Sequence, residues 1–280
     1  MIELPETYVL SEQISQTLVG KTVMNVMANV HPHGFAWFTG NPDEYHSKLS
    51  GKTITASNPG TGYTCGGNTE ITCGDILLVL STPVKFLAAD EKLPAKHQLL
   101  IEFEDHSHMS CTVQMWGAMF CYPAGENGLP DAFVCNKCPS PLTDAFDEDY
   151  FEGLWQNTKP SLSAKAFLAT EQRIPGLGNG VLQDILYNAK IHPRRRLESI
   201  TATEKANLFG SVKQTLFEMT AGGGRDTERD LFGCPGGYKT KLSAKTKGKP
   251  CQTCGSEIIR EAFLGGNIYY CPKCQRFEKK

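Results

Sequence analysis

The stretch CQTCGSEIIREAFLGGNIYYCPKC, residues 251–274, has the most specific spacing in this sequence of 280 residues. It holds two CxxC pairs separated by 16 residues, and its thiols are Cys251, Cys254, Cys271 and Cys274. Two such pairs bring four sulfur ligands into the tetrahedral arrangement that zinc prefers. We therefore expect one structural zinc ion on these four thiolates, with a β-hairpin between the pairs. The alternative is two redox-active CxxC pairs.

This cysteine module is too short to bury a core of its own. Metal binding, worth roughly 10–16 kcal/mol in isolated zinc-finger peptides, would have to fold it. Basic residues lie within it and after it, at Lys273, Arg276, Lys279 and Lys280. A zinc hairpin with basic flanks is typical of contact with nucleic acid, although many such modules are only structural.

The segment before the module, residues 233–250, is rich in Gly and Lys and poor in apolar residues, so we expect a loop or linker there. Further back the apolar residues follow helical spacing. Thr201 and Glu204 predict a capping box at the start of the last helix. The expected helices cover residues 147–156, 161–172, 179–190 and 203–219.

A glycine-rich turn, Arg173-Ile-Pro-Gly-Leu-Gly-Asn179, separates two of these helices. Asn179 can cap the helix that follows, and free N–H groups at a helix N-terminus form a ready phosphate site. Lys190 and the run Arg194, Arg195 and Arg196 follow closely. This clustering favours contact with a nucleic-acid backbone over a turn without function.

The N-terminal half has a different pattern. Apolar spacing predicts a helix over Thr7–Gly20. After it come β-rich runs divided by Gly, Pro, Asn and Asp, at residues 21–30, 51–57, 75–82, 98–105 and 109–120. We therefore expect an α+β protein: an N-terminal helix plus β-sandwich, a helical module, and a zinc-ribbon hairpin. The expected domain boundaries are 1–136, 143–235 and 248–277.

Charge is distributed unevenly along the chain. Residues 1–160 hold 8 Lys and Arg against 19 Asp and Glu, whereas residues 161–280 hold 20 against 11. A basic half points to a polyanionic partner, the alternative being an ordinary solvated surface. No run of 18 apolar residues exists, and the start MIELPE lacks the apolar region of a signal peptide. We expect a cytoplasmic, nucleoid-associated monomer with no membrane contact, in which the 11 cysteines are not disulfides.

Four segments together resemble the formamidopyrimidine-DNA glycosylase / endonuclease VIII family. They are IELPE (2–6), PLTDAFDEDY (141–150), QRIPGLGNGVLQDILYNAKIHPRR (172–195) and the cysteine module. The third is similar to the family's helix–two-turn–helix motif. The resemblance implies a β-sandwich, that helical module and a zinc finger, with damaged or abasic duplex DNA as partner. It also implies removal of oxidised bases, followed by β-elimination at the abasic site through a Schiff base.

The resemblance assigns catalysis to the N-terminus. The family nucleophile is the amine of a proline exposed by removal of Met1, and Ile2 stands in its place here. A bulky second residue hinders that removal, so the amine belongs to Met1, or to Ile2 after trimming. Glu3 matches the glutamate that protonates the opened sugar, and Glu6 matches a second acid. Without the resemblance, both carboxylates are explained by the helix dipole.

Other family positions differ in this chain. The family's basic lysine has no equivalent, and the nearest segment, 60–75, offers Tyr63 or Asp75. Gln114 and Met115 replace two arginines of a strand turn. Met115 or Trp116 can wedge into a base stack, but core packing is the preferred interpretation.

Two further family positions concern DNA contact. Asn267 replaces the phosphate-binding arginine of the zinc hairpin, whereas Asn179 and the pair Lys96-His97 match. The pair Cys135-x2-Cys138 can bind metal or sense redox state, but ordinary reduced thiols are the preferred interpretation.

Two functional hypotheses follow from these residues. The first is a weak DNA glycosylase and abasic-site lyase. The second is a catalytically impaired, zinc-containing DNA-binding protein on the same scaffold. A zinc-ribbon RNA binder is a third and weaker hypothesis.

Overall fold

A computed structural model describes residues 2–60, 67–126, 128 and 138–277. The chain divides into two compact units, in which unit 1 comprises Met1–Lys137 with Glu228–Gly236, and unit 2 comprises Cys138–Thr227 with Gly237–Lys280. No helix in the described part of the chain combines the length and the apolar character that a membrane span requires.

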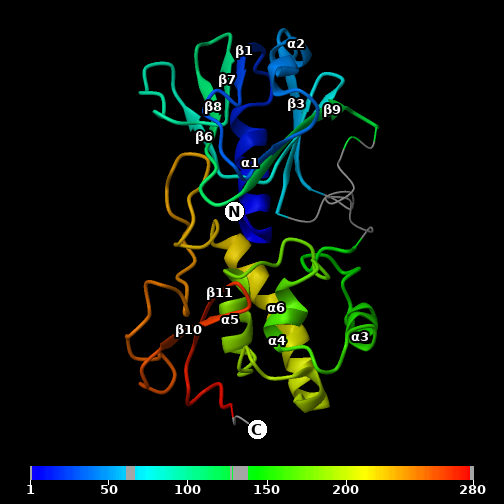
Figure 1. Ribbon diagram of the computed structural model, residues 1–280, viewed down its shortest axis with the longest axis vertical. Coiled ribbons are helices and arrows are strands. Elements are labelled where there is room, and N and C mark those ends of the chain that lie inside the picture. Colours follow the sequence, from blue (N-terminus) through cyan, green and yellow to red (C-terminus); the bar gives the residue numbers. More distant parts are fainter. Residues whose placement is uncertain (1, 61–66, 127, 129–137, 278–280) are drawn as a thin grey trace. The chain divides into compact units, whose positions relative to one another are not determined.

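Unit 1 contains two sheets and a long helix (Figure 1). Its helices are α1 (Leu4–Thr17), α2 (Tyr45–Leu49) and a 3-10 turn at Pro42–Glu44. One sheet has the strand order β1-β7-β8-β6 and the other β2-β9-β5-β4-β3. The strands are β1 (Val23–Ala28), β2 (Ala36–Phe38), β3 (Ile54–Pro59), β4 (Thr69–Cys73), β5 (Ile76–Leu80), β6 (Val84–Leu87), β7 (Leu99–Phe103), β8 (His108–Cys111) and β9 (Gly117–Pro123).

The core of unit 1 forms where α1 packs on the sheets. Leu10, Ile14 and Leu18 are buried at helical spacing and join one cluster with residues of both sheets. The helix predicted over Thr7–Gly20 is present but begins earlier, at Leu4, because Glu3 and Glu6 form a reciprocal capping box. The predicted helix and β-sandwich are therefore confirmed.

The expected run 109–120 is two strands in the structure. β8 ends at Cys111 and β9 begins at Gly117, so residues 112–116 form the connection between them. β9 pairs antiparallel with β5 and parallel with the three-residue β2. This pairing places the β8–β9 connection beside β2.

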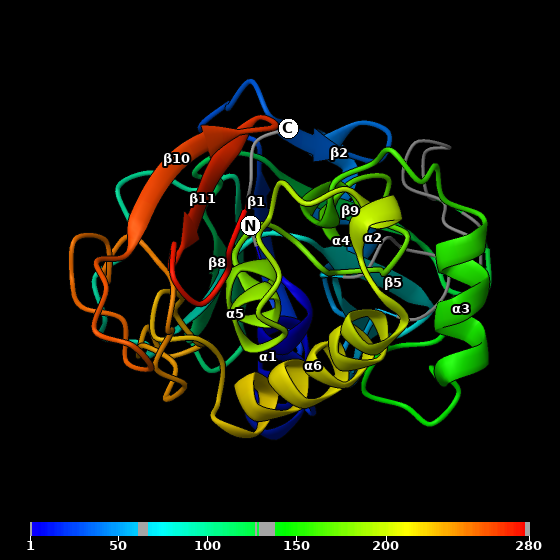
Figure 2. The same cartoon turned by 90° about the horizontal axis from the view of Figure 1, so that it is seen from below.

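Unit 2 is a helical module with a two-stranded hairpin. Its helices are α3 (Glu148–Gln156), α4 (Ala164–Ala169), α5 (Val181–Asn188), α6 (Ala202–Ala221) and a 3-10 turn at Leu197–Ser199; its strands are β10 (Ile259–Phe263) and β11 (Gly266–Tyr270). Side chains of Asp147, Ser163 and Thr201 cap α3, α4 and α6. The predicted capping box between Thr201 and Glu204 is confirmed. Figure 2 shows the hairpin beside α5.

The hairpin turn consists of Leu264 and Gly265, which both have positive φ values, 48° and 70°. Two residues of positive φ between paired strands form the tight turn that matches strand twist. Phe263 therefore pairs with Gly266, and Ala262 with Asn267. The predicted hairpin between the CxxC pairs is confirmed, and its register is fixed by this turn.

The expected linker at 233–250 is anchored near its middle, and its first residues belong to unit 1. Backbone N–H groups of Lys241 and Leu242 donate to the Asp184 carboxylate at 2.9 and 2.8 Å, and Leu242 is buried. Burial raises the pKa of Asp184 against these hydrogen bonds. Residues 228–236 instead pack in unit 1, where Leu231 joins the core.

Candidate metal centre and nucleic-acid interface

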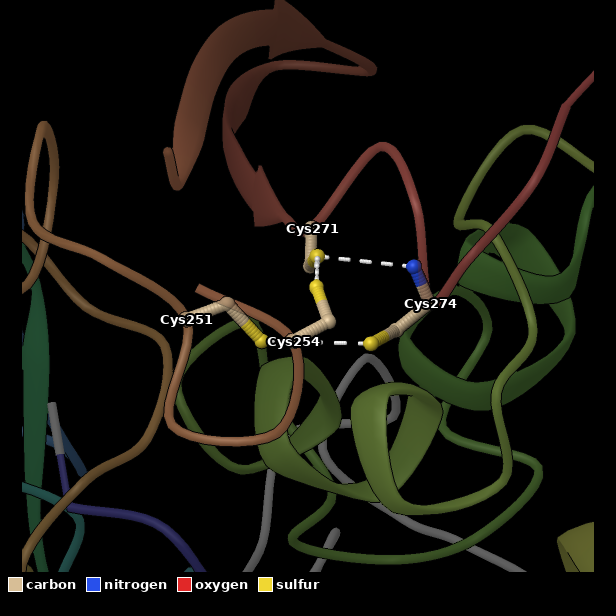
Figure 3. A group of neighbouring side chains, drawn as sticks. All are labelled: Cys251, Cys254, Cys271 and Cys274. Carbon is tan, nitrogen blue, oxygen red and sulfur yellow. Dashed lines mark hydrogen bonds between the residues drawn. The ribbon is translucent and has the colours of Figure 1, made fainter. Parts of the chain in front are cut away.

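The four predicted zinc ligands converge in unit 2 (Figure 3). Their sulfur atoms all lie within 4.8 Å of one another, and no other group of three or more His, Cys, Asp or Glu with metal-site geometry occurs among the described residues. Sγ of Cys251 lies 3.9 Å from Sγ of Cys274, and Sγ of Cys254 lies 3.3 Å from Sγ of Cys271. Both contacts join cysteines of different CxxC pairs.

This arrangement fits a zinc ion. A tetrahedron with Zn–S bonds of about 2.3 Å has sulfur–sulfur edges of about 3.8 Å. The two contacts above bracket that length and exceed the roughly 2.05 Å of a disulfide bond. Hydrogen bonds from Ser256 lower the pKa of Cys254 to about 6, which favours the thiolate form that binds metal.

Residues outside the cluster hold it to the helical module. The Tyr187 hydroxyl, on α5, lies 3.1 Å from Cys251 Sγ and 2.8 Å from Thr253 Oγ1. The buried Gln275 accepts from the Cys271 N–H at 3.0 Å and donates to the Ile191 carbonyl at 2.9 Å. The cysteine knuckles are thus fixed relative to α5 and to the segment that follows it.

Asn179 lies against the hairpin. Its Nδ2 donates to the Asn267 carbonyl at 3.0 Å, and Gln183 Nε2 donates to the same oxygen at 3.1 Å. A Cβ at Gly266 would lie 3.5 Å from the Asn179 amide. The prediction that Asn179 caps α5 is wrong, because Gly180 is the N-cap and Asn179 Oδ1 accepts no hydrogen bond from the described part of the protein.

Arg260 is a residue that the sequence analysis missed. It is exposed on β10, and its Nε donates to Asn267 Oδ1 at 3.0 Å. The hairpin register brings this guanidinium to the side chain of Asn267. The resemblance matches Asn267 to the family's phosphate-binding arginine. Lys190 and Lys273 are also exposed, and no ion pair of either is formed within the described residues.

Three predicted DNA-binding arginines are engaged inside unit 2. Arg173 pairs with Glu171 at 2.5 Å and donates to the Thr170 carbonyl. Arg194 pairs with Glu261 at 3.1 Å, and its guanidinium lies 4.2 Å from the centroid of the Phe263 ring.

Arg195 binds Glu204 through both terminal nitrogens and lowers the pKa of that carboxyl to about 2. The contacts of all three arginines favour a positioning role for them.

The residues of the N-terminal motif are buried in unit 1. Ile2 is 3% exposed, and its side chain belongs to the hydrophobic core. Glu3 and Glu6 are also buried, and Glu6 Oε2 accepts from the Glu3 N–H at 3.3 Å. Gly67 approaches so closely that a Cβ there would lie 2.9 Å from the Ile2 carbonyl oxygen. Residues 2–6 are therefore held in one position by packing.

The β8–β9 connection differs from expectation at one residue. Met115 is 73% exposed, so the preferred interpretation of core packing is wrong for it, and Trp116 is half-buried. Met115 lies in the connection between two sheets and is not a member of the hydrophobic core of unit 1.

Two other sequence matches lie nearby in the chain. His97 is buried edge-to-face against His31, with ring centroids 4.8 Å apart, and Lys96 is exposed.

The remaining candidate site residues have little structural support for a functional role. Asp75 is exposed and pairs with Lys52, which holds the pKa of that carboxyl below its usual value. Tyr63, Cys65 and Cys135 lie outside the described residues. Cys138 is half-buried and free, whereas Cys73, Cys111 and Cys121 are buried thiols with raised pKa values.

These features define an α+β protein that joins a β-sandwich unit to a helical module with a four-cysteine hairpin. The MutM (Fpg) protein of Thermus thermophilus has the same fold, with a TM-score of 0.78, 22% identity and 98% of each chain covered. The Lactococcus lactis Fpg, solved in complex with an abasic site containing DNA, gives a TM-score of 0.79 at 21% identity, covering 98% of this chain and 100% of that one.

Sequence relatives extend over the whole chain. The formamidopyrimidine-DNA glycosylase of Listeria innocua is 29% identical over 284 residues, covering 99% of this chain and 100% of the relative. That of Alteromonas mediterranea is 29% identical over 290 residues with the same coverage. No protein-family model matches the chain. The chain is thus similar over its whole length to formamidopyrimidine-DNA glycosylases.

Proposed function

We propose that the protein is a DNA repair glycosylase that binds damaged or abasic duplex DNA and cleaves the abasic strand by β-elimination. The observation that carries this proposal is similarity to formamidopyrimidine-DNA glycosylases over 99% of the chain, with the motif at residues 2–6 buried and held in place. The expected domains, 1–136, 143–235 and 248–277, then serve as catalytic, DNA-binding and zinc-finger parts.

One structural zinc ion belongs to this proposal. Cys251, Cys254, Cys271 and Cys274 would hold it, and the four sulfurs lie at distances that suit it. The ion would close the two knuckles and fold the hairpin between them. Protein side chains would then position the hairpin on the helical module, because the folded hairpin brings Asn267 to Asn179 and Gln183.

DNA phosphates are the ligands that we assign to the exposed part of unit 2. Arg260 offers terminal guanidinium nitrogens beside Asn267, and Lys190 and Lys273 offer exposed ammonium groups. Asn179 orients the hairpin toward this ligand. Arg173, Arg194 and Arg195, which are engaged within unit 2, would support this phosphate-binding surface by holding the fold that carries it. Met115 would contact bases.

The proposed chemistry uses the N-terminal amine. Its nitrogen forms a bond to the sugar C1′ while the bond from C1′ to the base breaks and the amine gives up a proton. The C1′–O4′ bond then breaks, its electron pair going to O4′, as the nitrogen lone pair forms the protonated imine. The imine withdraws electrons, so the C2′ proton is lost and the C3′–O bond breaks, releasing the phosphate. Glu3 would protonate the sugar ring oxygen as the ring opens. Glu6 accepts the Glu3 N–H and so fixes the turn that carries it.

A catalytically impaired DNA-binding protein is the second candidate, and the burial of Ile2 favours it. A proline at position 2 would place a secondary amine whose direction is fixed by its ring, whereas Ile2 places its side chain in the core. A displacement of the amine by ~1 Å can cost about a hundredfold in rate. We therefore expect slow cleavage.

Borohydride trapping on abasic duplex DNA tests the enzyme, preceded by intact-mass measurement of the mature N-terminus. We expect slow trapping by the wild type, loss of trapping in Glu3→Gln, and faster trapping in Ile2→Pro. Because Ile2→Pro empties a core position, it costs about 2–4 kcal/mol of stability and is assayed at low temperature. Absence of trapping by both the wild type and Ile2→Pro, with abasic-duplex binding intact, would establish the impaired binder instead.

A further inference from the structure

A row of aromatic rings lies on unit 1 where β2 meets the β8–β9 connection. The ring centroids of Phe35 and Trp37 are 6.4 Å apart, and those of Trp37 and Trp116 are 5.9 Å apart. His33 extends the row, with its centroid 6.3 Å from that of Phe35. Successive rings are tilted by 56–62°. The row is continuous across two segments that are distant in sequence.

The row is exposed although its backbone is fixed. Phe35 is 60% exposed and Trp37 is 37% exposed, and Met115, which precedes Trp116 in the β8–β9 connection, is 73% exposed. Alternate residues Ala36 and Phe38 pack on the core instead. The Gly117 N–H donates to the Phe35 carbonyl at 2.9 Å, and Trp37 is paired with Ala118. Large rings held outward on a paired strand mark a binding surface rather than a frayed edge.

Charge near the row distinguishes it from the rest of unit 1. Residues 22–42 and 107–125, which carry all of these rings, contain no Asp, Glu, Lys or Arg. Residues 1–137, which make up most of unit 1, hold 14 acidic side chains elsewhere, and these repel a polyanion. The segments that carry the aromatic row thus add no carboxylate to the surface that a nucleic-acid strand would meet. They also add none of the lysines and arginines that phosphates select.

Neutral aromatic rings without fixed cations suit the faces of bases more than phosphates. In an intact duplex the base faces are stacked on one another, whereas unpaired bases leave them accessible. We propose that Phe35, Trp37 and Trp116 form a stacking surface for unpaired nucleobases of a DNA strand, with little sequence preference. This assignment rests on the proposed DNA-binding function and names the part of the substrate that unit 1 contacts.

Binding of the full-length zinc-loaded protein to oligothymidylate of about 12 nucleotides tests the surface, by anisotropy and by quenching of tryptophan fluorescence. We expect Phe35→Ala and Trp37→Ala each to weaken binding about tenfold, within the range for loss of one stacking ring. Phe217→Ala is the matched control, since Phe217 is 59% exposed on α6. It should change the affinity less than about twofold. Binding to an intact duplex should be unchanged in all three variants.

Four results would overturn the stacking surface. They are no oligothymidylate binding by the wild type, equal effects of Phe35→Ala and Phe217→Ala, equal losses on oligothymidylate and intact duplex, and dimerisation lost in Phe35→Ala. The last would make a second copy of the chain the occupant. Trapping on abasic duplex reports separately on the proposed function. If the wild type is trapped but Phe35→Ala does not change oligothymidylate binding, only the stacking surface is contradicted. If Phe35→Ala weakens that binding but neither the wild type nor Ile2→Pro is trapped, only the enzymatic function is contradicted.

Discussion

Arginine side chains of unit 2 include some that hold the fold and, at the hairpin, Arg260, which remains available. Arg194 covers the Phe263 ring and binds Glu261, and Arg195 is held by Glu204. Arg260 reaches only Asn267 within the described residues, through Nε, so its terminal nitrogens face no carboxylate there. The basic character of the C-terminal half therefore overstates the number of cations that DNA can meet.

This division predicts opposite outcomes for two substitutions. Arg260→Ala removes a phosphate contact, so the slope of log affinity against log salt on duplex DNA should fall by about 0.9. Arg195→Ala should leave that slope unchanged and lower the stability of unit 2, because Glu204 loses its partner. Affinity measured at several salt concentrations, with thermal unfolding of each variant, checks both. A slope lowered by Arg195→Ala and unaffected by Arg260→Ala would contradict the assignment.

His192 predicts a pH dependence for unit 2. It is buried between Tyr270 and Phe277, with ring centroids at 4.3 and 4.7 Å, and its Nδ1 accepts the Arg194 N–H at 3.1 Å. Burial lowers the pKa of His192 to about 4, from about 6.5 in an unfolded chain. Between these values the unfolded state binds the extra proton, so stability is complete above about pH 6.5 and falls with acidification.

From pH 7 to pH 5 this single group should cost about 2 kcal/mol. His192→Gln keeps a hydrogen-bond acceptor without a titrating ring, so its stability should fall less over the same interval. Denaturant unfolding of both proteins at the two pH values measures the difference, in which any common loss of metal affinity cancels. Equal losses in the two proteins would show that His192 does not titrate on unfolding.

At the scale of elements, the hairpin depends on the cysteine cluster more than on its own packing. β10 is largely solvent-facing. The hairpin of β10 and β11 is joined to α5 through Gln183, which accepts from the Tyr269 N–H at 3.0 Å. α5 and α6, by contrast, bury apolar residues such as Leu182, Leu186 and Leu216. The helices should therefore survive a loss that the hairpin does not.

Removal of zinc tests this difference between elements. Chelation, or Cys254→Ser, should abolish amide protection in β10 and β11, retain it in α5 and α6, and weaken DNA binding through displacement of Asn267. Cys234→Ser is the matched control, since Cys234 is free and exposed. Metal analysis with hydrogen exchange should find one zinc in the wild type and the control. A hairpin that keeps its protection without zinc would refute the dependence.

Local signals predicted the elements that are governed locally. The box of Thr201 and Glu204 located the start of α6 to within one or two residues, because those side chains bond within one turn. β2, β4 and β6 were missed, and for β2 the reason is that a three-residue strand paired with the distant β9 leaves almost no periodicity. The four cysteines were found from spacing alone. Arg260 was not, because only the two-residue turn sets which β10 side chain reaches Asn267.

At the scale of the whole molecule, the chain order does not match the packing units. After the helices of unit 2, residues 228–236 return to unit 1 before the chain enters the cysteine module. Gln13 on α1 accepts from the Leu231 N–H at 2.9 Å and donates to Asp230 at 3.0 Å, and the Leu231 carbonyl accepts from Phe86 at 2.8 Å. A sequence boundary at residue 136 therefore omits part of the core of unit 1.

Because residues 228–236 pack in unit 1, a substitution there should destabilise elements of unit 1 that are distant in sequence. It should leave the helices of unit 2 unaffected. Leu231→Ala empties a fully buried position and should lower the stability of unit 1 by about 2–5 kcal/mol. Phe232→Ala, at the neighbouring half-exposed position, should cost about 1 kcal/mol or less. Because two units need not unfold together, residue-resolved hydrogen exchange is the suitable measurement. Protection should fall in α1 and β6 and persist in α5 and α6; an equal fall in both units, or equal effects of the two substitutions, would show that Leu231 does not anchor the segment to unit 1.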